Sequence, residues 1–186
     1  MSILDSFYYV ISSVPSGTSI ASGAAKCAPA RSESTRIVVD DVILGHAETP
    51  AQLRACFPVM AQLRPHLCGP EDFAARIGRM RAERYRLLAA WQDSIPIALA
   101  GYRLQENLIY GSFLYVDDLV VADSYRGRQW GARLLDELEG IARQAGCRKL
   151  VLDTALSNAL AQRFYFRQGL LTGAMRFSKA LVQEPA

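Results

Sequence analysis

The segment from Leu119 to Ala132 constrains the fold more than any other part of the chain. The apolar run Leu119-Val120-Val121 leads into a short turn rich in arginine and glycine, and Leu134, Leu135 and Leu138 follow at helical spacing. β-Branched residues favour strands, and leucines three and four positions apart favour one face of a helix. The segment therefore predicts a strand that passes through a tight turn into a helix, a connection typical of α/β domains.

The turn itself reads Arg126-Gly127-Arg128-Gln129-Trp130-Gly131 and predicts an anion site. The first N–H groups of a helix have no intrahelical acceptor, and with the helix dipole they attract a pyrophosphate. Glycines in the turn let such a ligand approach the backbone closely. The chain has neither G-x-x-x-x-G-K-[ST] nor an early G-x-G-x-x-G, so an ATP-type P-loop and a dinucleotide fold are unsupported. Taken alone, the segment also fits an ordinary basic turn at a helix start.

A second pattern follows one strand later. Asn158, Ala161, Tyr165 and Gly169 recur at steps of three, four and four residues. On a helix this spacing stacks an amide, a small residue and a phenol on one face. The alternative is an ordinary amphipathic helix in which Tyr165 is a core aromatic.

The rest of the chain predicts two regions. Residues 1–35 are rich in Ser, Gly and Ala and show no useful period, so we expect a flexible N-terminal extension followed by a single domain over residues 36–186. Strand and helix patterns then follow in the order β-α-α-β-β-β-α-β-α-β. We expect strands at 37–44, 85–91, 95–104, 109–121, 150–152 and a last one ending at 181, and helices opened by Pro50, Pro70, the loop at 126–131 and Asn158. Short turns between the central strands predict antiparallel hairpins, hence a mixed, mostly antiparallel sheet flanked by helices.

Composition excludes several classes of protein. The hydrophobic fraction of 51% predicts a folded core, and no apolar stretch reaches the roughly 18 residues of a membrane span. A net charge of +3 makes nucleic acid an unlikely partner. The four cysteines form no C-x-x-C pair, so we expect no metal site and no disulfide scaffold, but reduced thiols in a cytoplasmic protein.

Together the two motifs resemble those of the GCN5-related N-acetyltransferase (GNAT) superfamily. Its acetyl-CoA loop, Arg/Gln-x-x-Gly-x-Gly/Ala, matches Arg126 to Gly131, and its helix motif, Asn-x-x-Ala-x-x-x-Tyr-x-x-x-Gly-Phe, matches Asn158 to Gly169 with Leu170 in the Phe place. The resemblance covers about residues 36–181. Gln129 departs from it, because it stands where the family's inner glycine belongs and could crowd the pyrophosphate.

The resemblance implies an acetyl-CoA-dependent acyltransferase in which an amine attacks the thioester directly. It places Tyr165 as the acid for the leaving thiolate and Asp117 beside the amine, as a base or an anionic anchor. By strand alternation, Asp117 should share a face with Tyr115 and Leu119, and Asp118 should point to the opposite face, where it would hold backbone or an arginine. The cofactor-binding residues it implies are Leu119, Val120, Val121, Arg126, Gly127, Arg128, Gln129, Trp130, Gly131, Ala132 and Asn158, with no metal.

The acceptor stays open. A primary amine of a small molecule, polyamine-like or other, is the expected partner beside acetyl-CoA. The alternatives are a non-catalytic acetyl-CoA sensor and an acetyltransferase that acts on protein or aminoacyl-tRNA amines. A homodimer is compatible with the resemblance, and no membrane partner is expected.

Overall fold

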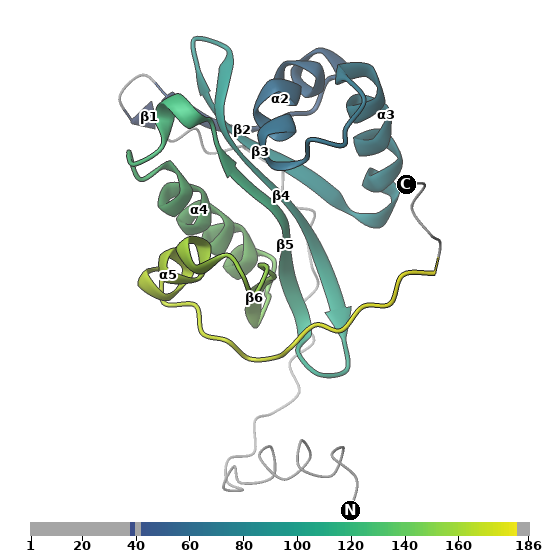
Figure 1. Cartoon of the computed structure of the whole chain (residues 1–186), viewed down its shortest axis with the longest axis vertical. Helices are drawn as coiled ribbons and strands as arrows, with labels where there is room; N and C mark the ends of the chain where they lie inside the picture. Colours follow the sequence, from purple (N-terminus) through teal and green to yellow (C-terminus); the bar gives the residue numbers. More distant parts are fainter. Residues whose placement is uncertain (1–37, 40–41, 182–186) are drawn as a thin grey trace, which may run out of the picture. The chain divides into compact units, whose positions relative to one another are not determined.

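A computed structural model describes residues 38–39 and 42–181 of the chain. The expected N-terminal extension, residues 1–35, lies outside the described residues. The described chain forms a six-stranded sheet in the order β1-β2-β3-β4-β5-β6 (Figure 1). All neighbouring strands are antiparallel except β5 and β6, which are parallel. The predicted mixed, mostly antiparallel sheet is therefore confirmed.

The elements follow the predicted order closely. The strands are β1 (Val38–Val39), β2 (Val42–His46), β3 (Tyr85–Gln92), β4 (Ile95–Asn107), β5 (Gly111–Val121) and β6 (Lys149–Leu152). The helices are α2 (Pro50–Leu63), α3 (Pro70–Met80), α4 (Trp130–Gln144) and α5 (Ala159–Arg167), with short 3-10 turns η1 (Arg81–Glu83) and η2 (Asp123–Tyr125). The expected first strand is in fact the β1–β2 hairpin.

Local sequence signals explain where helices α2 and α3 begin. The Thr49 side chain accepts a hydrogen bond from the Gln52 N–H, and the Gln52 side chain accepts one from the Thr49 N–H. This reciprocal capping box satisfies backbone donors at the start of α2. Prolines occupy the first turns of both α2 and α3, where their missing N–H costs nothing.

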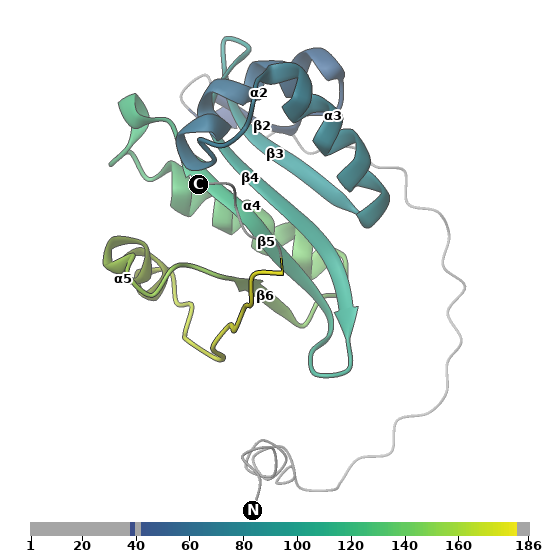
Figure 2. The same cartoon turned by 45° about the vertical axis from the view of Figure 1, so that its right-hand side comes forward.

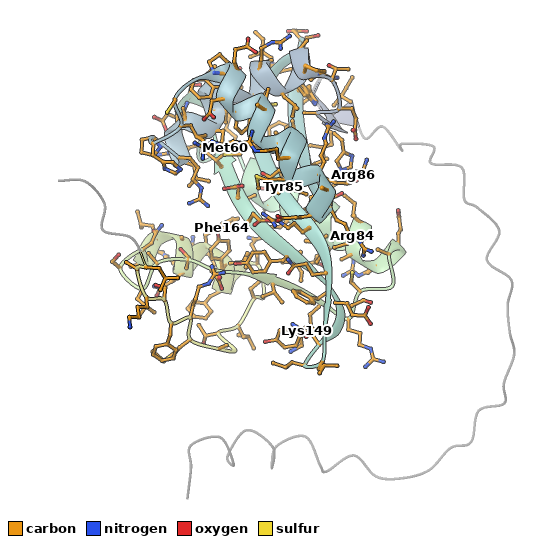
Figure 3. The ribbon with its side chains drawn as sticks, turned by 90° about the vertical axis from the view of Figure 1, so that its right-hand side faces the viewer. Met60, Arg84, Tyr85, Arg86, Lys149 and Phe164 are labelled. Atoms are coloured by element: carbon orange, nitrogen blue, oxygen red, sulfur yellow. The ribbon has the colours of Figure 1, made fainter. Side chains whose placement is uncertain are left out.

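Helices cover both faces of the sheet (Figure 2). On one face, α2 and α3 bury a cluster that includes Met60, Phe73 and Tyr85. On the other, α4 buries Trp130, Leu134 and Leu138, with α5 packed against its edge. Figure 3 shows Tyr85 and Met60 on the α2–α3 side and Phe164 on the α5 side.

The two central features for function lie in β5. First, β5 pairs with β6 only over Phe113–Val116, opposite Lys149–Leu152. Beyond Val116 no described strand lies on that side of β5. The second half of β5 therefore has an unpaired edge on the β6 side, and the space beside this edge is called the gap below.

Second, β5 carries a β-bulge. Val116 pairs with Tyr102 and Asp118 with Gly101, so Asp117 is an extra residue. Leu114 and Val116 lie in the cluster under α4 before the bulge, and Leu119 and Val121 pack against that same cluster after it. The extra residue therefore changes which residues face each helix layer.

The last predicted strand is wrong for the described residues. Residues 170–181 have no regular structure, and all of 171–181 are exposed. The alternation of Leu171, Met175 and Phe177 suits a strand, but a strand forms only against a hydrogen-bonding partner, and none of the described strands pairs with this segment.

Candidate acyl-transfer site

The loop between β5 and α4 has the geometry of an anion site. The first intrahelical bond of α4 runs from the Arg133 N–H to the Gln129 carbonyl (3.1 Å), so the N–H groups of Trp130, Gly131 and Ala132 find no acceptor within the helix. Gly127 adopts a left-handed φ of 77° and has open space where a side chain would stand. This loop therefore presents free backbone donors at the positive end of a helix dipole.

The arginines of the loop are held at its surface. Arg126 pairs with Asp123 (2.7 Å), and both side chains are mostly exposed. Arg128 lies over the Tyr125 ring and Arg133 over the Trp130 ring. Trp130 itself is buried in the core under α4, so it contributes its N–H group to the loop while its ring anchors the helix.

Gln129, which stands at the position of the family's inner glycine, adopts a backbone conformation that is typical of glycine. Its φ is 63°, in the left-handed region that side-chain-bearing residues seldom adopt. Gly131 also has a packing role beside the expected close approach of a ligand. A Cβ atom there would lie 3.1 Å from Phe164 Cζ, so glycine permits the close packing of α5 on the start of α4.

That packing brings the second motif beside the loop. Asn158 caps α5, since its side-chain oxygen accepts a hydrogen bond from the Ala161 N–H (3.1 Å). Tyr165 is half-buried against the α4 core, and burial raises the pKa of its phenol. Among the described residues no group hydrogen-bonds the Tyr165 hydroxyl. The phenol thus stays protonated at neutral pH and free to donate.

The open side of β5 supplies further donors. The Ala122 N–H donates to the Ile97 carbonyl of β4 (2.9 Å). Because successive N–H groups of a strand alternate in direction, those of Leu119 and Val121 point away from β4, toward the gap past β6. Such free backbone donors can stabilise negative charge that develops on a carbonyl oxygen.

Regular strand alternation predicted that Asp117 and Asp118 would lie on opposite faces of the sheet. In the structure both carboxylates lie on the same side. The Asp118 carboxylate accepts from Tyr85 (2.9 Å) and pairs with Arg64 (2.8 Å), both on the α2–α3 side. The Asp117 carboxylate pairs with Arg103 (3.1 Å), whose guanidinium lies over the same Tyr85 ring. The bulge is the reason, because it inserts one residue between the two alternating halves of the strand. The expectation that Asp118 would hold an arginine is confirmed.

Asp117 has a perturbed environment. Burial raises the pKa of its carboxyl, the Arg103 guanidinium opposes that change, and the neighbouring Asp118 adds to it. A carboxylate with a raised pKa is a better proton acceptor than an exposed one. The guanidinium of Arg103 also reaches Glu83 (2.5 Å), so Asp117 lies at one end of a short charged chain.

Sequence patterns missed the residues around this pair. Arg103, Tyr85 and Gly101 stand in strands that read as ordinary, and Arg64 lies at the end of a helix far away in the chain. The one available signal was the pair of acids within an apolar strand, which demands partners but does not name them.

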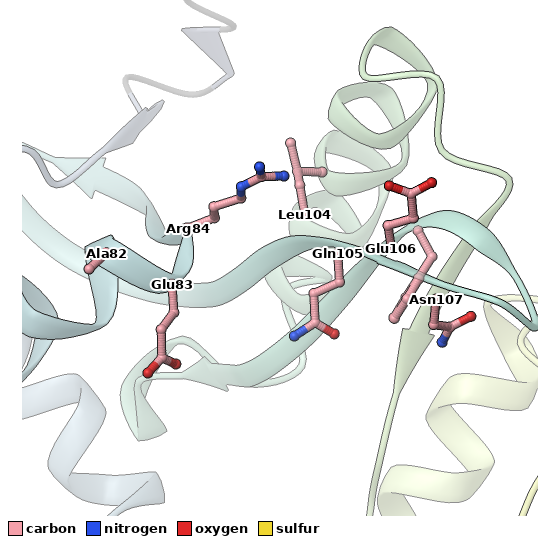
Figure 4. A pocket seen from close by; sticks show the side chains of 8 residues that line it. Ala82, Glu83, Arg84, Leu104, Gln105, Glu106 and Asn107 are labelled. Carbon is pink, nitrogen blue, oxygen red and sulfur yellow. The ribbon is translucent and has the colours of Figure 1, made fainter.

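Two surface hollows lie away from the loop. One of about 460 Å³ is lined by η1, the turn after it and the second half of β4 (Figure 4). The other, of about 510 Å³, is lined by Glu48, Arg81, Arg84 and Arg86 with parts of β3 and β4. Neither hollow includes the loop or Tyr165. We therefore assign the site on backbone geometry rather than on concavity.

Metal and membrane chemistry find no support in the described part of the chain. No group of three His, Cys, Asp or Glu side chains there could hold a metal ion. Among the helices over residues 42–181, none is long and apolar enough to cross a membrane.

The sequence is similar to those of known proteins. The model of the acetyltransferase (GNAT) family matches residues 52–170. The chain is 31% identical over 113 residues to the uncharacterized N-acetyltransferase YhdJ of Bacillus subtilis, an alignment that covers 59% of this chain and 77% of that protein. It is 34% identical over 98 residues to the aminoalkylphosphonate N-acetyltransferase of Salmonella typhimurium, covering 52% of this chain and 62% of the relative.

Other relatives differ in substrate. Glucosamine 6-phosphate N-acetyltransferase 1 of Dictyostelium discoideum is 39% identical over 101 residues, 51% of this chain and 62% of its own length. The alignments thus span less than two thirds of this relative and of the Salmonella enzyme.

Solved structures agree on the fold. An acetyltransferase of Trypanosoma brucei superimposes with a TM-score of 0.64 at 22% identity, covering 76% of this chain and all of that one. The aminoglycoside acetyltransferase AAC(6')-Iy, solved with a CoA-linked bisubstrate analogue, gives a TM-score of 0.65 at 17% identity, covering 76% of this chain and 99% of that one. With a family match over more than half its length and the predicted motifs in place, the chain belongs to the acetyltransferase (GNAT) family.

Proposed function

We propose that this chain transfers the acetyl group of acetyl-CoA directly to a primary amine of a small molecule. One observation carries the proposal: the start of α4, with its free N–H groups, the unpaired second half of β5 and Tyr165 all contribute residues to one hydrophobic cluster on the α4 side of the sheet. This combination suits a ligand with a pyrophosphate at one end and a thioester at the other.

The residues divide the chemistry as follows. Backbone N–H groups from Gly127 to Ala132 hold the pyrophosphate, and the N–H groups of Leu119 and Val121 stabilise charge on the thioester oxygen. The amine nitrogen bonds to the carbonyl carbon, the C–S bond breaks, and the Tyr165 hydroxyl gives its proton to the departing thiolate. The proton that the amine loses passes to Asp117, directly or through water, or to solvent if Asp117 only anchors the amine.

The names of the relatives support the proposed acceptor class. The named substrates of three of them, an aminoalkylphosphonate, glucosamine 6-phosphate and an aminoglycoside, are all amines of small molecules. A small amine, polyamine-like or of one of these kinds, is therefore the acceptor we propose for this chain.

Titration calorimetry of the full chain with acetyl-CoA tests the donor site, with desulfo-CoA and adenosine as comparison ligands. Binding shared by desulfo-CoA but not by adenosine supports a pyrophosphate–pantetheine site. Thiol release is then measured with spermidine, an aminoalkylphosphonate, glucosamine 6-phosphate and an aminoglycoside. Binding without turnover on any amine would favour a sensor, and absence of binding would refute the proposal.

A pair of variants tests the loop. Gly127 and Gly146 both have left-handed φ values, 77° and 71°, and both face open space. Glutamate at either position incurs the same backbone strain, but only Gly127→Glu places a carboxylate at the anion site. We expect Gly127→Glu to weaken acetyl-CoA binding by about 100-fold, because like charges in contact cost several kcal/mol. Equal affinities of the two variants would contradict the assignment.

A further inference from the structure

We propose that Arg64, Tyr85 and Asp118 form a clamp that holds the β5 bulge in place, and that these three are positioning residues for acetyl transfer. The inference rests on the proposed function, because it assigns a task to the bulge beside the reacting groups. The three residues come from different elements: the end of α2, the start of β3 and the middle of β5.

Arg64 makes two contacts with consecutive residues of the bulge. Its Nε donates to Asp118 Oδ1 (2.8 Å), and its terminal nitrogen donates to the backbone carbonyl of Asp117 (3.1 Å). A guanidinium is planar and rigid, so two donors on one side of it fix both the side chain of one residue and the backbone of the one before it. Arg64 therefore stabilises the bulged backbone conformation as well as the Asp118 carboxylate.

Tyr85 is the third member of the clamp. Its hydroxyl donates to Asp118 Oδ2 (2.9 Å), so both carboxylate oxygens are engaged. The Tyr85 residue is only 1% exposed and the Asp118 side chain only 11%. Buried charges of this kind persist when each acceptor has a partner, which is the case here.

Gly101 makes room for this contact. A Cβ atom at Gly101 would lie 1.9 Å from the Tyr85 hydroxyl oxygen and 2.9 Å from Asp118 Oδ2. Gly101 is also the residue of β4 that pairs with Asp118. The sheet thus has a vacancy at the bulge that the phenol–carboxylate pair fills.

The clamp affects function because it fixes which residues of β5 face each side of the sheet. If β5 continued without the bulge, Asp118 would face the apolar cluster under α4, and Leu119 and Val121 would exchange sides with Val120. The N–H groups that face the gap would then belong to other residues. Holding Asp118 on the α2–α3 side therefore fixes both the free N–H groups of Leu119 and Val121 and the position of Asp117.

Turnover of Arg64→Gln tests the clamp, with Arg54→Gln as matched control. Arg54 lies on the same helix and makes only a peripheral pair with Glu71 (3.4 Å). We expect Arg64→Gln to lower kcat by about 30-fold with the KM for acetyl-CoA within about 2-fold of the parent, because misplacement of reacting groups by about 1 Å costs up to 100-fold. Arg54→Gln should leave both constants unchanged. Arg64→Lys, which keeps the charge but not the two-donor geometry, should fall between them.

The pH profile separates positioning from loss of structure. The charged groups that face Asp117 are Arg64 from α2, Arg103 from β4, Glu83 from η1 and Asp118 from β5, with Tyr85 of β3 beneath. Arg64 lowers the pKa of the Asp117 carboxyl and Asp118 raises it. The acidic limb of kcat should therefore move to higher pH in Arg64→Gln and to lower pH in Asp118→Asn. General destabilisation would not move the limb in opposite directions.

Amide hydrogen exchange gives a readout that needs no turnover. Exchange over residues 117–121 should accelerate in Arg64→Gln and not in Arg54→Gln. If the parent protein turns over an amine and Arg64→Gln matches it in kcat, pH profile and exchange, the clamp is overturned. If the parent acetylates no amine, the proposed function fails instead, and unchanged exchange would still overturn the clamp. Should Arg64→Gln not fold, Arg64→Lys decides by the same measurements.

Discussion

Replacing Gly101 by alanine tests the packing at the bulge. The added Cβ atom would lie 1.9 Å from the Tyr85 hydroxyl oxygen and 2.6 Å from its Cζ. Ordinary contacts begin near 3.4 Å, so the phenol would have to move by about 1.5 Å. Tyr85 has little room to do so, because it is buried beneath α2 and α3.

Two costs add in this variant. Forcing extra volume into a packed core costs about 1–3 kcal/mol. Moving the hydroxyl also breaks its bond to Asp118, and a buried carboxylate oxygen left without its donor costs about 1–3 kcal/mol more. We therefore expect the free energy of unfolding to fall by about 2–6 kcal/mol.

Urea denaturation followed by circular dichroism measures this loss. Gly78→Ala is the matched control, because Gly78 lies in α3 with no atom within 4 Å of an added Cβ. Alanine is the better helix former by about 0.5–1 kcal/mol, so this control should be slightly more stable than the parent protein.

A double-mutant cycle with Tyr85→Leu shows whether the clash is with the phenol. Tyr85→Leu should destabilise the parent protein but cost much less in the Gly101→Ala background, where the phenol is already displaced. A loss below about 1 kcal/mol in Gly101→Ala, or fully additive effects, would refute the packing described at the bulge.

Three further predictions follow from single side chains. Tyr165→Phe should lower kcat by about 100-fold, as loss of a general acid does, while calorimetry shows acetyl-CoA binding retained; unchanged turnover would exclude Tyr165 as the acid. Gln129→Gly should raise the free energy of unfolding by about 1 kcal/mol, because glycine adopts the φ of 63° without strain; a loss of stability would show that the Gln129 side chain makes a needed contact. Burial, and then Arg86, lower the pKa of the His46 imidazole, so the unfolded chain binds its proton more readily, and stability present above about pH 6.5 should decline as the pH falls further. Denaturation midpoints measured from about pH 8 to about pH 5 should show this decline in the parent protein and a flatter one in His46→Gln.

Local patterns predicted most of the fold because the signals themselves were local. Pro50 and Pro70 mark the starts of α2 and α3, and Gly146 adopts the left-handed conformation just after α4, as expected. The strands of the central hairpins were bounded by turn residues within a few positions of the observed ends. Both motifs also fell on the predicted elements, since their spacing already encodes a helix.

The bulge was not predictable in the same way. The pattern Val116-Asp117-Asp118-Leu119 fits regular alternation, and nothing within the strand shows that one residue is extra. The partners that stabilise the bulge lie far away, with Arg64 separated from Asp118 by 54 positions in the chain. Contacts at such separations arise from the tertiary fold, and a single sequence does not reveal which arginine meets which acid.

The expected last strand shows the opposite limit. Residues 170–181 alternate well enough to predict a strand, yet pairing depends on a partner edge rather than on the segment itself. Arg176 instead pairs with Asp153 and lies over the Tyr115 ring.

The bulge also divides β5 into two halves whose side chains alternate in opposite phase. Before Asp117, even-numbered residues lie beneath α4, and after it, odd-numbered residues do. Deleting Asp117 would remove the extra residue and leave a regular strand in which Leu119 and Val121 still lie beneath α4, whereas straightening the strand without a deletion would turn both toward the other helix layer. A relative that is one residue shorter at this point should therefore keep both core layers of the sheet but lose the bulge, and with it the position that Asp117 occupies.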